Sequence, residues 1–176
     1  MMNGEIKRRI DNLRDLLVGK IPVPTEQVKQ ITLALIYKFM SDIDEQNKEL
    51  GGKSFFRDEY EQYAWKRIMD HSISAYERVK LYSEGLEKMS LNAGIPQLFR
   101  DIFRGAFLPF RDAATVDQFL KGINDFEYEH SEDLGDAYEY LLSVMGAQGD
   151  AGQFRTPRHI IDFIVEAVIH SCWNGC

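Results

Sequence analysis

The chain has 176 residues, of which 44 % are hydrophobic and 28 % charged, and it carries a formal net charge of −7. This length and balance are typical of a globular protein with one domain, or with one domain and the start of another. The negative charge argues against a free-standing DNA clamp, because affinity for DNA comes mainly from Lys and Arg side chains that neutralise phosphates.

Helical periodicity begins near the N-terminus. Apolar residues recur every three or four positions from Ile6 to Leu17, which predicts a first amphipathic helix. Pro22 and Pro24 then interrupt the pattern, and Thr25 is the predicted N-cap of a second helix. From Ile31 to Met40 this helix is apolar on nearly every side, so we expect it to lie at the centre of the fold.

Four more helices are predicted in the middle of the chain, over residues 58–69, 74–91, 95–103 and 114–126. The second of these is expected to end at Asn92-Ala93-Gly94. No stretch alternates convincingly as a strand, and no internal repeat is present. The predicted fold class is therefore all-α, and residues 1–130 are expected to form a multi-helix bundle.

The last part of the chain has the best-defined local pattern. Ser131 is a predicted N-cap, with acidic residues in the following turn and a helical apolar pattern up to Met145. A glycine-rich loop, residues 146–152, follows. Thr156 then stands at an N-cap position, with Pro157 at the first position of a last helix, where a missing N–H costs nothing.

Three stretches carry a family resemblance. The sequence Gly-Asp-Ala-Tyr-Glu-Tyr-Leu-Leu at 135–142, the glycine-rich loop, and Gly-Gln-Phe-Arg-Thr-Pro-Arg at 152–158 resemble the start of the catalytic domain in one family. That family comprises the methylation subunits of type I restriction-modification enzymes. The stretch at 33–42 is similar to a helix of their N-terminal helical domain. The turn at 152–158 is the most specific part of the resemblance.

The resemblance implies a site for S-adenosylmethionine at this turn. Its candidate contacts are Gln153, Phe154, Arg155, Thr156, Pro157 and Arg158. Physical chemistry is compatible with that assignment, because a helix N-terminus offers unpaired N–H groups to a carboxylate and a glycine-rich loop allows close approach. The alternative is an ordinary capped helix that follows a surface loop, with Phe154 in the core.

Two motifs that this family needs are missing from the chain. Adenine-N6 methyltransferases of this kind carry a glycine-rich cofactor loop, Asp-Pro-x-Cys-Gly-Thr-Gly-Gly, and an Asn-Pro-Pro-(Tyr/Phe) loop for the flipped-out adenine. The five prolines here are never adjacent. We therefore expect residues 131–170 to be the truncated start of a Rossmann-like methyltransferase domain and 171–176 an atypical tail. No catalytic residue or metal ligand is assigned, and the chain alone is expected to be inactive.

The resemblance also implies partners. These are a second methylation subunit, a sequence-recognition subunit and a restriction subunit, with DNA bound through the assembled complex. Cys172 and Cys176 cannot form a disulfide framework, and the sequence has neither a membrane span nor the apolar core of a signal peptide, so a cytoplasmic protein is expected. The alternative hypothesis is a free-standing all-α protein-interaction module without a cofactor.

Three further patterns have a functional and an ordinary interpretation. His170, Cys172 and Cys176 could be zinc ligands, although a frayed chain end is favoured because a fourth ligand is not nearby. Aromatic and basic residues alternate between Phe99 and Arg111, as in a nucleic-acid surface or in an amphipathic helix with its phenylalanines inward, and the three- to four-residue spacing of the phenylalanines favours the helix. The cluster at 7–9 could contact DNA, but a solvated helix end is favoured.

Overall fold

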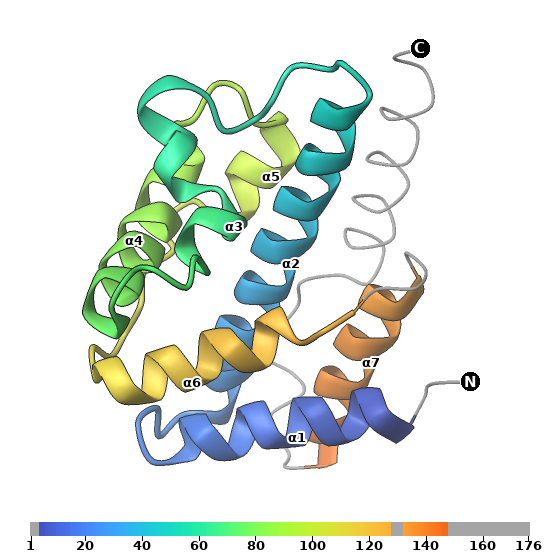
Figure 1. Ribbon diagram of the computed structural model, residues 1–176. Helices are drawn as coiled ribbons and strands as arrows, with labels where there is room; N and C mark the ends of the chain where they lie inside the picture. The colour runs from blue at the N-terminus through green and yellow to red at the C-terminus, as the bar shows by residue number, and fades with distance from the viewer. Residues whose placement is uncertain (1–3, 128–131, 148–176) are drawn as a thin grey trace.

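The computed structural model describes residues 4–127 and 132–147, and in those residues it contains helices and no strand (Figure 1). This confirms the all-α prediction. The elements in chain order are α1 (Gly4–Val18), α2 (Pro24–Glu49), the 3₁₀-helix η1 (Asp58–Tyr63), α3 (Trp65–Ile68), α4 (Ala75–Lys88), the 3₁₀-helix η2 (Met89–Leu91), α5 (Gln97–Ile102), α6 (Ala113–Asn124) and α7 (Glu132–Ala147). Within the described part of the chain, no helix is apolar over enough of its length to cross a membrane.

Helix α2 is the centre of the fold, as predicted. Every residue from Gln30 to Ser41 is buried. Helices α1, α3, α6 and α7 all contact α2, and Figure 1 shows it running through the middle of the bundle. The predicted N-cap is wrong by two positions, because Val23 is the N-cap and Pro24 is the first helical residue. Proline suits that position, since its fixed φ matches the helix and its missing N–H would be unpaired there anyway.

An aromatic cluster lies where α2 meets α3, α4 and α5. The ring of Tyr37 is 5.7 Å from those of Trp65 and Tyr82, and 6.0 Å from that of Phe103. Its hydroxyl donates a 2.6 Å hydrogen bond to the carbonyl of Tyr63. A side chain at Gly85 would meet this hydroxyl at 2.3 Å, so glycine at this position of α4 leaves room for the Tyr37 side chain.

The prediction of one helix over 58–69 is wrong. The chain forms η1 up to Tyr63, extends at Ala64 and then makes the single turn of α3. Both backbone groups beside the break bond to α2: the Tyr63 carbonyl accepts from Tyr37, and the Trp65 N–H donates to Ser41 Oγ at 2.8 Å. These tertiary hydrogen bonds replace the ones that a continuous helix would make.

The predicted helix over 74–91 is confirmed, with its last residues in the 3₁₀-helix η2. Ser74 and Glu77 form a capping box at its start, in which the Ser74 hydroxyl accepts from the Glu77 N–H and the Glu77 carboxylate accepts from the Ser74 N–H. Asn92 closes the helix as predicted. Its side chain donates to the Phe55 carbonyl at 2.9 Å and accepts from the Gly94 N–H at 2.9 Å.

A buried ion pair joins α4 to α6. Arg78, with 6 % of its surface exposed, donates to a carboxylate oxygen of Asp117 and, at 2.9 Å each, to the carbonyls of Ile68 and Asp70. Burial by itself would raise the pKa of Asp117, but hydrogen bonds from Lys121 and Arg78, and their charges, hold it below its ordinary value. The pair therefore fixes three segments of the chain to one another.

Candidate functional site

The predicted cofactor contacts lie outside the described residues. This holds for all six of them: Gln153, Phe154, Arg155, Thr156, Pro157 and Arg158. It also holds for the N-cap at Ser131 and for the zinc candidates His170, Cys172 and Cys176. Their roles stay predictions. The structure does describe the helix that precedes the glycine-rich loop, and that helix is α7.

Helix α7 packs into the same core as the helices before it. Leu134, Ala137 and Leu141 are 3 %, 0 % and 0 % exposed, and they recur at the three- and four-residue spacing of one helix face. This face contacts α1 and α2, and Figure 1 shows α7 beside them at the lower right. The start of the sequence segment that carries the family resemblance is thus attached to the N-terminal bundle.

A polar contact accompanies this packing. The hydroxyl of Tyr140 on α7 donates to the carboxylate of Asp11 on α1, with both oxygens at 2.9 Å. The ammonium group of Lys7 lies 5.7 Å from the centroid of the Tyr140 ring, within the range of a cation–π contact. Burial, and then the hydrogen bond and charge of Asp11, raise the pKa of Tyr140 above its ordinary value. We call this set of three side chains the α1–α7 contact.

Sequence reasoning did not find the α1–α7 contact. Tyr140 and Asp11 are 129 positions apart, and neither has a local pattern that indicates the other. The only available signal was that Tyr140 belongs to the stretch resembling the methylation subunits. The cluster at 7–9 is likewise used inside the molecule: Lys7 faces Tyr140, and Arg9 pairs with Glu5 at 2.8 Å and donates to the Asp125 carbonyl. Lys7 and Arg8 are exposed and Arg9 is half-buried, which agrees with the favoured interpretation of a solvated helix end.

The aromatic and basic residues from Phe99 to Arg111 divide into two groups. Phe99 and Phe103 are buried in the core, whereas the Phe107 side chain is 53 % exposed. Arg104 pairs with Asp101 at 2.7 Å. Phe110 is half-buried against the core. The structure therefore favours core packing for three of these phenylalanines, and it leaves Phe107 exposed.

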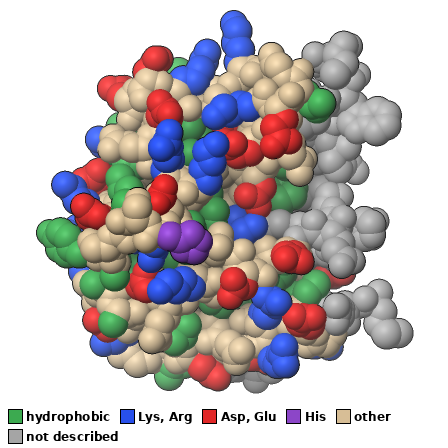
Figure 2. All heavy atoms as spheres, viewed as in Figure 1, with side chains coloured by type: hydrophobic (Ala, Val, Ile, Leu, Met, Phe, Trp, Pro, Cys, Tyr) green, Lys and Arg blue, Asp and Glu red, His purple; other side chains and the backbone are tan. Residues whose placement is uncertain are grey.

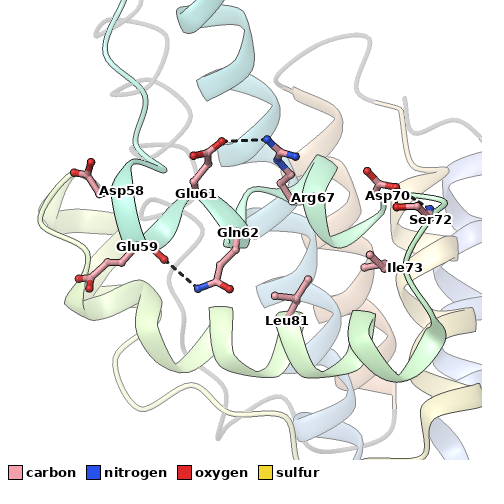
Figure 3. Close-up of a pocket in the computed structure, with 9 residues that line it drawn as sticks. All are labelled: Asp58, Glu59, Glu61, Gln62, Arg67, Asp70, Ser72, Ile73 and Leu81. Carbon is pink, nitrogen blue, oxygen red and sulfur yellow. Dashed lines mark hydrogen bonds and ion pairs between the residues drawn. The ribbon is translucent and has the colours of Figure 1, made fainter.

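An open hollow of about 580 Å³ lies between η1, α3 and the first half of α4 (Figure 3). Its lining residues are Asp58, Glu59, Glu61, Gln62, Arg67, Asp70, Ser72, Ile73 and Leu81. Arg67 is paired with Glu61 at 3.1 Å, so acidic groups dominate the rim. Hydrogen bonds from the Ser72 hydroxyl and N–H lower the pKa of Asp70, which keeps that carboxyl ionised. Such a rim repels phosphates and carboxylates, so this hollow is unsuited to an anionic ligand.

The described residues contain no group of three or more His, Cys, Asp and Glu side chains that could hold a metal ion. His71 is exposed, and the other three histidines lie outside the described residues. On the face shown in Figure 2, basic and acidic side chains are intermixed, without a field of one sign.

Comparison with known proteins finds similarity to a DNA methylase family in the C-terminal part of the chain. Residues 129–173 match the family model "N-6 DNA Methylase". A stretch of 72 residues, 39 % of the chain, is 26 % identical to the protein named "Type I restriction enzyme EcoEI methylase subunit" from Escherichia coli. That stretch spans 15 % of the length of the Escherichia coli protein. These findings confirm the resemblance predicted from the sequence: residues 129–173 are similar to the N-6 DNA methylase family, and the chain is distantly similar to a type I restriction enzyme methylase subunit.

Proposed function

We propose that the chain is the N-terminal part of the methylation subunit of a type I restriction-modification system. In this proposal, a subunit that also carries the cofactor loop and the Asn-Pro-Pro-(Tyr/Phe) motif transfers a methyl group from S-adenosylmethionine to N6 of adenine in DNA. The observation that carries it is the match of residues 129–173 to the N-6 DNA methylase family. Helix α7 lies within these residues and packs on α1 and α2.

The role we propose for the helical bundle is to hold the methylase segment and to take part in subunit assembly and closure around DNA. Support comes from the α7 face, where three fully or almost fully buried apolar side chains and the α1–α7 contact fix the helix on the bundle. A movement of the bundle would therefore carry the helix that leads to the glycine-rich loop. The base sequence is read, in this proposal, by a separate recognition subunit.

The cofactor of this family is S-adenosylmethionine, which supplies the methyl group when bound. The described residues do not fit it. Their two unpartnered buried side-chain atoms, Gln30 Oε1 and Tyr82 Oη, do not line the hollow of Figure 3. That hollow has an acidic rim, whereas the cofactor carries a carboxylate that needs hydrogen-bond donors. The candidate contacts remain Gln153, Phe154, Arg155, Thr156, Pro157 and Arg158, and we assign no chemical step to any described residue.

We further propose that these 176 residues do not transfer methyl groups by themselves. The sequence has no two adjacent prolines, so the loop that holds a flipped-out adenine is missing from it. The partners in the proposed assembly are a second methylation subunit, a recognition subunit and a restriction subunit.

The test is transfer of a radiolabelled methyl group from S-adenosylmethionine to DNA. We expect none for the chain alone. We expect transfer when a methylation subunit that contains this chain and both missing motifs is combined with its recognition subunit. Calorimetry of the chain with S-adenosylmethionine should give weak or undetectable binding. Transfer by the chain alone, or tight cofactor binding, would contradict the proposed inactivity, and an inert assembly would contradict the proposed family function.

A further inference from the structure

Helix α4 lies on the outside of the bundle, and one of its faces is largely exposed (Figure 1). Five residues spaced three or four positions apart form this face: Tyr76, Lys80, Glu84, Glu87 and Leu91. The last of them belongs to η2, which follows α4 without a gap. At 3.6 residues per turn, the five side chains fall within about 80° of the helix circumference. We call them the α4 stripe.

The two ends of the α4 stripe are apolar and exposed. Tyr76 has 73 % of its surface exposed and Leu91 has 67 %. They are two of the six exposed large hydrophobic residues of the described chain, and about 22 Å of helix separates them. Burial of both side chains against a partner would be favourable, because it removes apolar surface from water.

The middle of the α4 stripe carries charges of both signs. Lys80 and Glu87 are exposed, and neither has an ion-pair partner among the described residues. Both line a hollow of about 360 Å³, together with Arg111 and with Glu84, which accepts a 3.1 Å hydrogen bond from Tyr63. Two cations and two carboxylates therefore share this surface. Its best complement is a surface that also carries both signs, which excludes a nucleic-acid strand.

The stripe is symmetric about its midpoint, which lies between positions 83 and 84. Lys80 and Glu87 lie at equal distances on either side, about 5 Å along the axis, and Tyr76 and Leu91 lie at about 11 Å. If two copies of α4 pack antiparallel about a two-fold axis through this midpoint, Lys80 of each copy is opposite Glu87 of the other. Tyr76 of each copy is likewise opposite Leu91 of the other. The stripe is thus its own complement in charge and in polarity.

We propose that the α4 stripe binds a second copy of this chain in an antiparallel, two-fold symmetric dimer. Two ion pairs between Lys80 and Glu87 and two contacts between Tyr76 and Leu91 hold the copies together. One helix pair buries less than the roughly 1,200 Å² of total surface at which stable interfaces begin, so the dimer forms reversibly as the concentration rises. Because it depends only on the pattern of α4, this dimer is independent of the proposed function.

Sedimentation velocity of the whole chain at low salt, over a range of concentrations, measures the dissociation constant of the dimer. We expect a monomer–dimer equilibrium for the unmodified chain. Lys80→Glu should raise the dissociation constant about tenfold or more, because the substituted side chain then faces Glu87 of the other copy at two places. Lys53→Glu is the control, since it changes the charge equally at an exposed position outside the stripe. Its effect should be clearly smaller.

Two rescues separate the proposed pairing from a general effect of charge. Glu87→Lys alone should weaken the dimer as Lys80→Glu does, whereas the double variant restores opposite charges and should dimerise like the unmodified chain. An equal mixture of the two single variants should form mixed dimers, since one copy then brings two carboxylates to the interface and the other brings two ammonium groups. All these positions are exposed, so the variants should fold, which circular dichroism would check.

The apolar ends have a matched pair of their own. Leu91→Ala should raise the dissociation constant about threefold or more, because the contact is lost twice in a symmetric dimer. Leu50→Ala removes the same atoms from a leucine that is 75 % exposed and lies outside the stripe, so it should leave the dissociation constant unchanged.

Three results would overturn the inference. The first is a chain that stays monomeric at the highest concentration, which is also the result expected if the stripe serves a different protein. The second is an equal effect of Lys80→Glu and Lys53→Glu. The third is a double variant, or a mixture of the single variants, that fails to dimerise. Methyl transfer by the assembled enzyme is measured separately, so none of these results bears on the proposed function.

Discussion

Helices α6 and α7 are attached to the same bundle in different ways. Helix α6 buries Val116, Phe119, Leu120 and Ile123, and it is joined to α4 by the buried pair of Arg78 and Asp117. Among the α7 side chains that the structure describes, Leu134, Ala137 and Leu141 are buried, and the polar contact is a half-buried tyrosine hydroxyl on Asp11. Because a buried ion pair holds α6 and a half-buried hydrogen bond holds α7, we expect α7 to detach before α6 does.

The largest effect is expected from Arg78→Met, which breaks the attachment of α6. The variant keeps an unbranched apolar stem but leaves the carbonyls of Ile68 and Asp70, and part of the Asp117 charge, without a partner. Breaking a buried ion pair costs about 3–5 kcal/mol. We expect the lower end, since Lys121 still pairs with Asp117 at 2.8 Å. Urea denaturation would measure the loss.

The control for this variant is Arg67→Met. Arg67 is 53 % exposed and pairs with Glu61 at 3.1 Å, so its loss should cost less than about 1 kcal/mol. If the two substitutions lowered the free energy of unfolding equally, the buried pair of Arg78 would hold α6 no more strongly than an exposed ion pair does.

An intermediate effect is expected from two matched truncations, Leu120→Ala on α6 and Leu141→Ala on α7. Both leucines are 0 % exposed, so each substitution removes the same atoms from a fully buried position. Such changes cost about 2–5 kcal/mol, depending on how far the surroundings can relax. We expect Leu141→Ala near the lower end, because α7 can open locally.

Hydrogen exchange would locate the two effects. Leu141→Ala should speed exchange mainly in α7, whereas Leu120→Ala should speed it throughout the bundle by lowering the global free energy of unfolding. If both variants changed exchange over the same residues, α6 and α7 would open as one unit and the comparison between them would fail.

The smallest effect is expected from Tyr140→Phe, which removes the hydrogen bond to Asp11 and keeps the ring. The expected loss is about 1 kcal/mol in the free energy of unfolding. Since the folded state raises the pKa of Tyr140, its contribution is complete below the ordinary tyrosine pKa of about 10 and is lost as pH rises through the raised value. The difference in stability between Tyr140→Phe and the unmodified chain should therefore shrink in alkali.

Urea denaturation at neutral and alkaline pH measures this difference, and the other tyrosines cancel because both proteins contain them. Tyr76→Phe is the matched control: that tyrosine is 73 % exposed, so its variant should match the unmodified chain at both pH values. A constant difference for Tyr140→Phe across the pH range would show that the hydroxyl does not hold α7.

The helices whose formation depends on residues close together in the chain were predicted correctly from the sequence. The helices over 74–91 and 114–126 and the central position of α2 follow from local spacing, and all three are present. The break at Ala64 could not be predicted, because it depends on hydrogen bonds from Tyr37 and to Ser41, more than twenty positions away.

For the candidate site, the sequence identifies residues that lie outside the part of the chain described by the structure. The family resemblance located the turn at 152–158 by its residue types alone, and the match over residues 129–173 confirms the resemblance without testing the individual contacts. The α1–α7 contact is the reverse case. It joins residues that are far apart in the chain, so only their arrangement in space identifies it.

The buried face of α7 has a practical consequence for anyone who shortens this protein. A version ending at residue 130 would lack Leu134, Ala137 and Leu141 and would leave the apolar surfaces they cover on α1 and α2 in water. Exposed apolar patches of this kind promote aggregation. A version ending after Ala147 would keep those surfaces covered, so we expect it to aggregate less on expression than a version ending at residue 130.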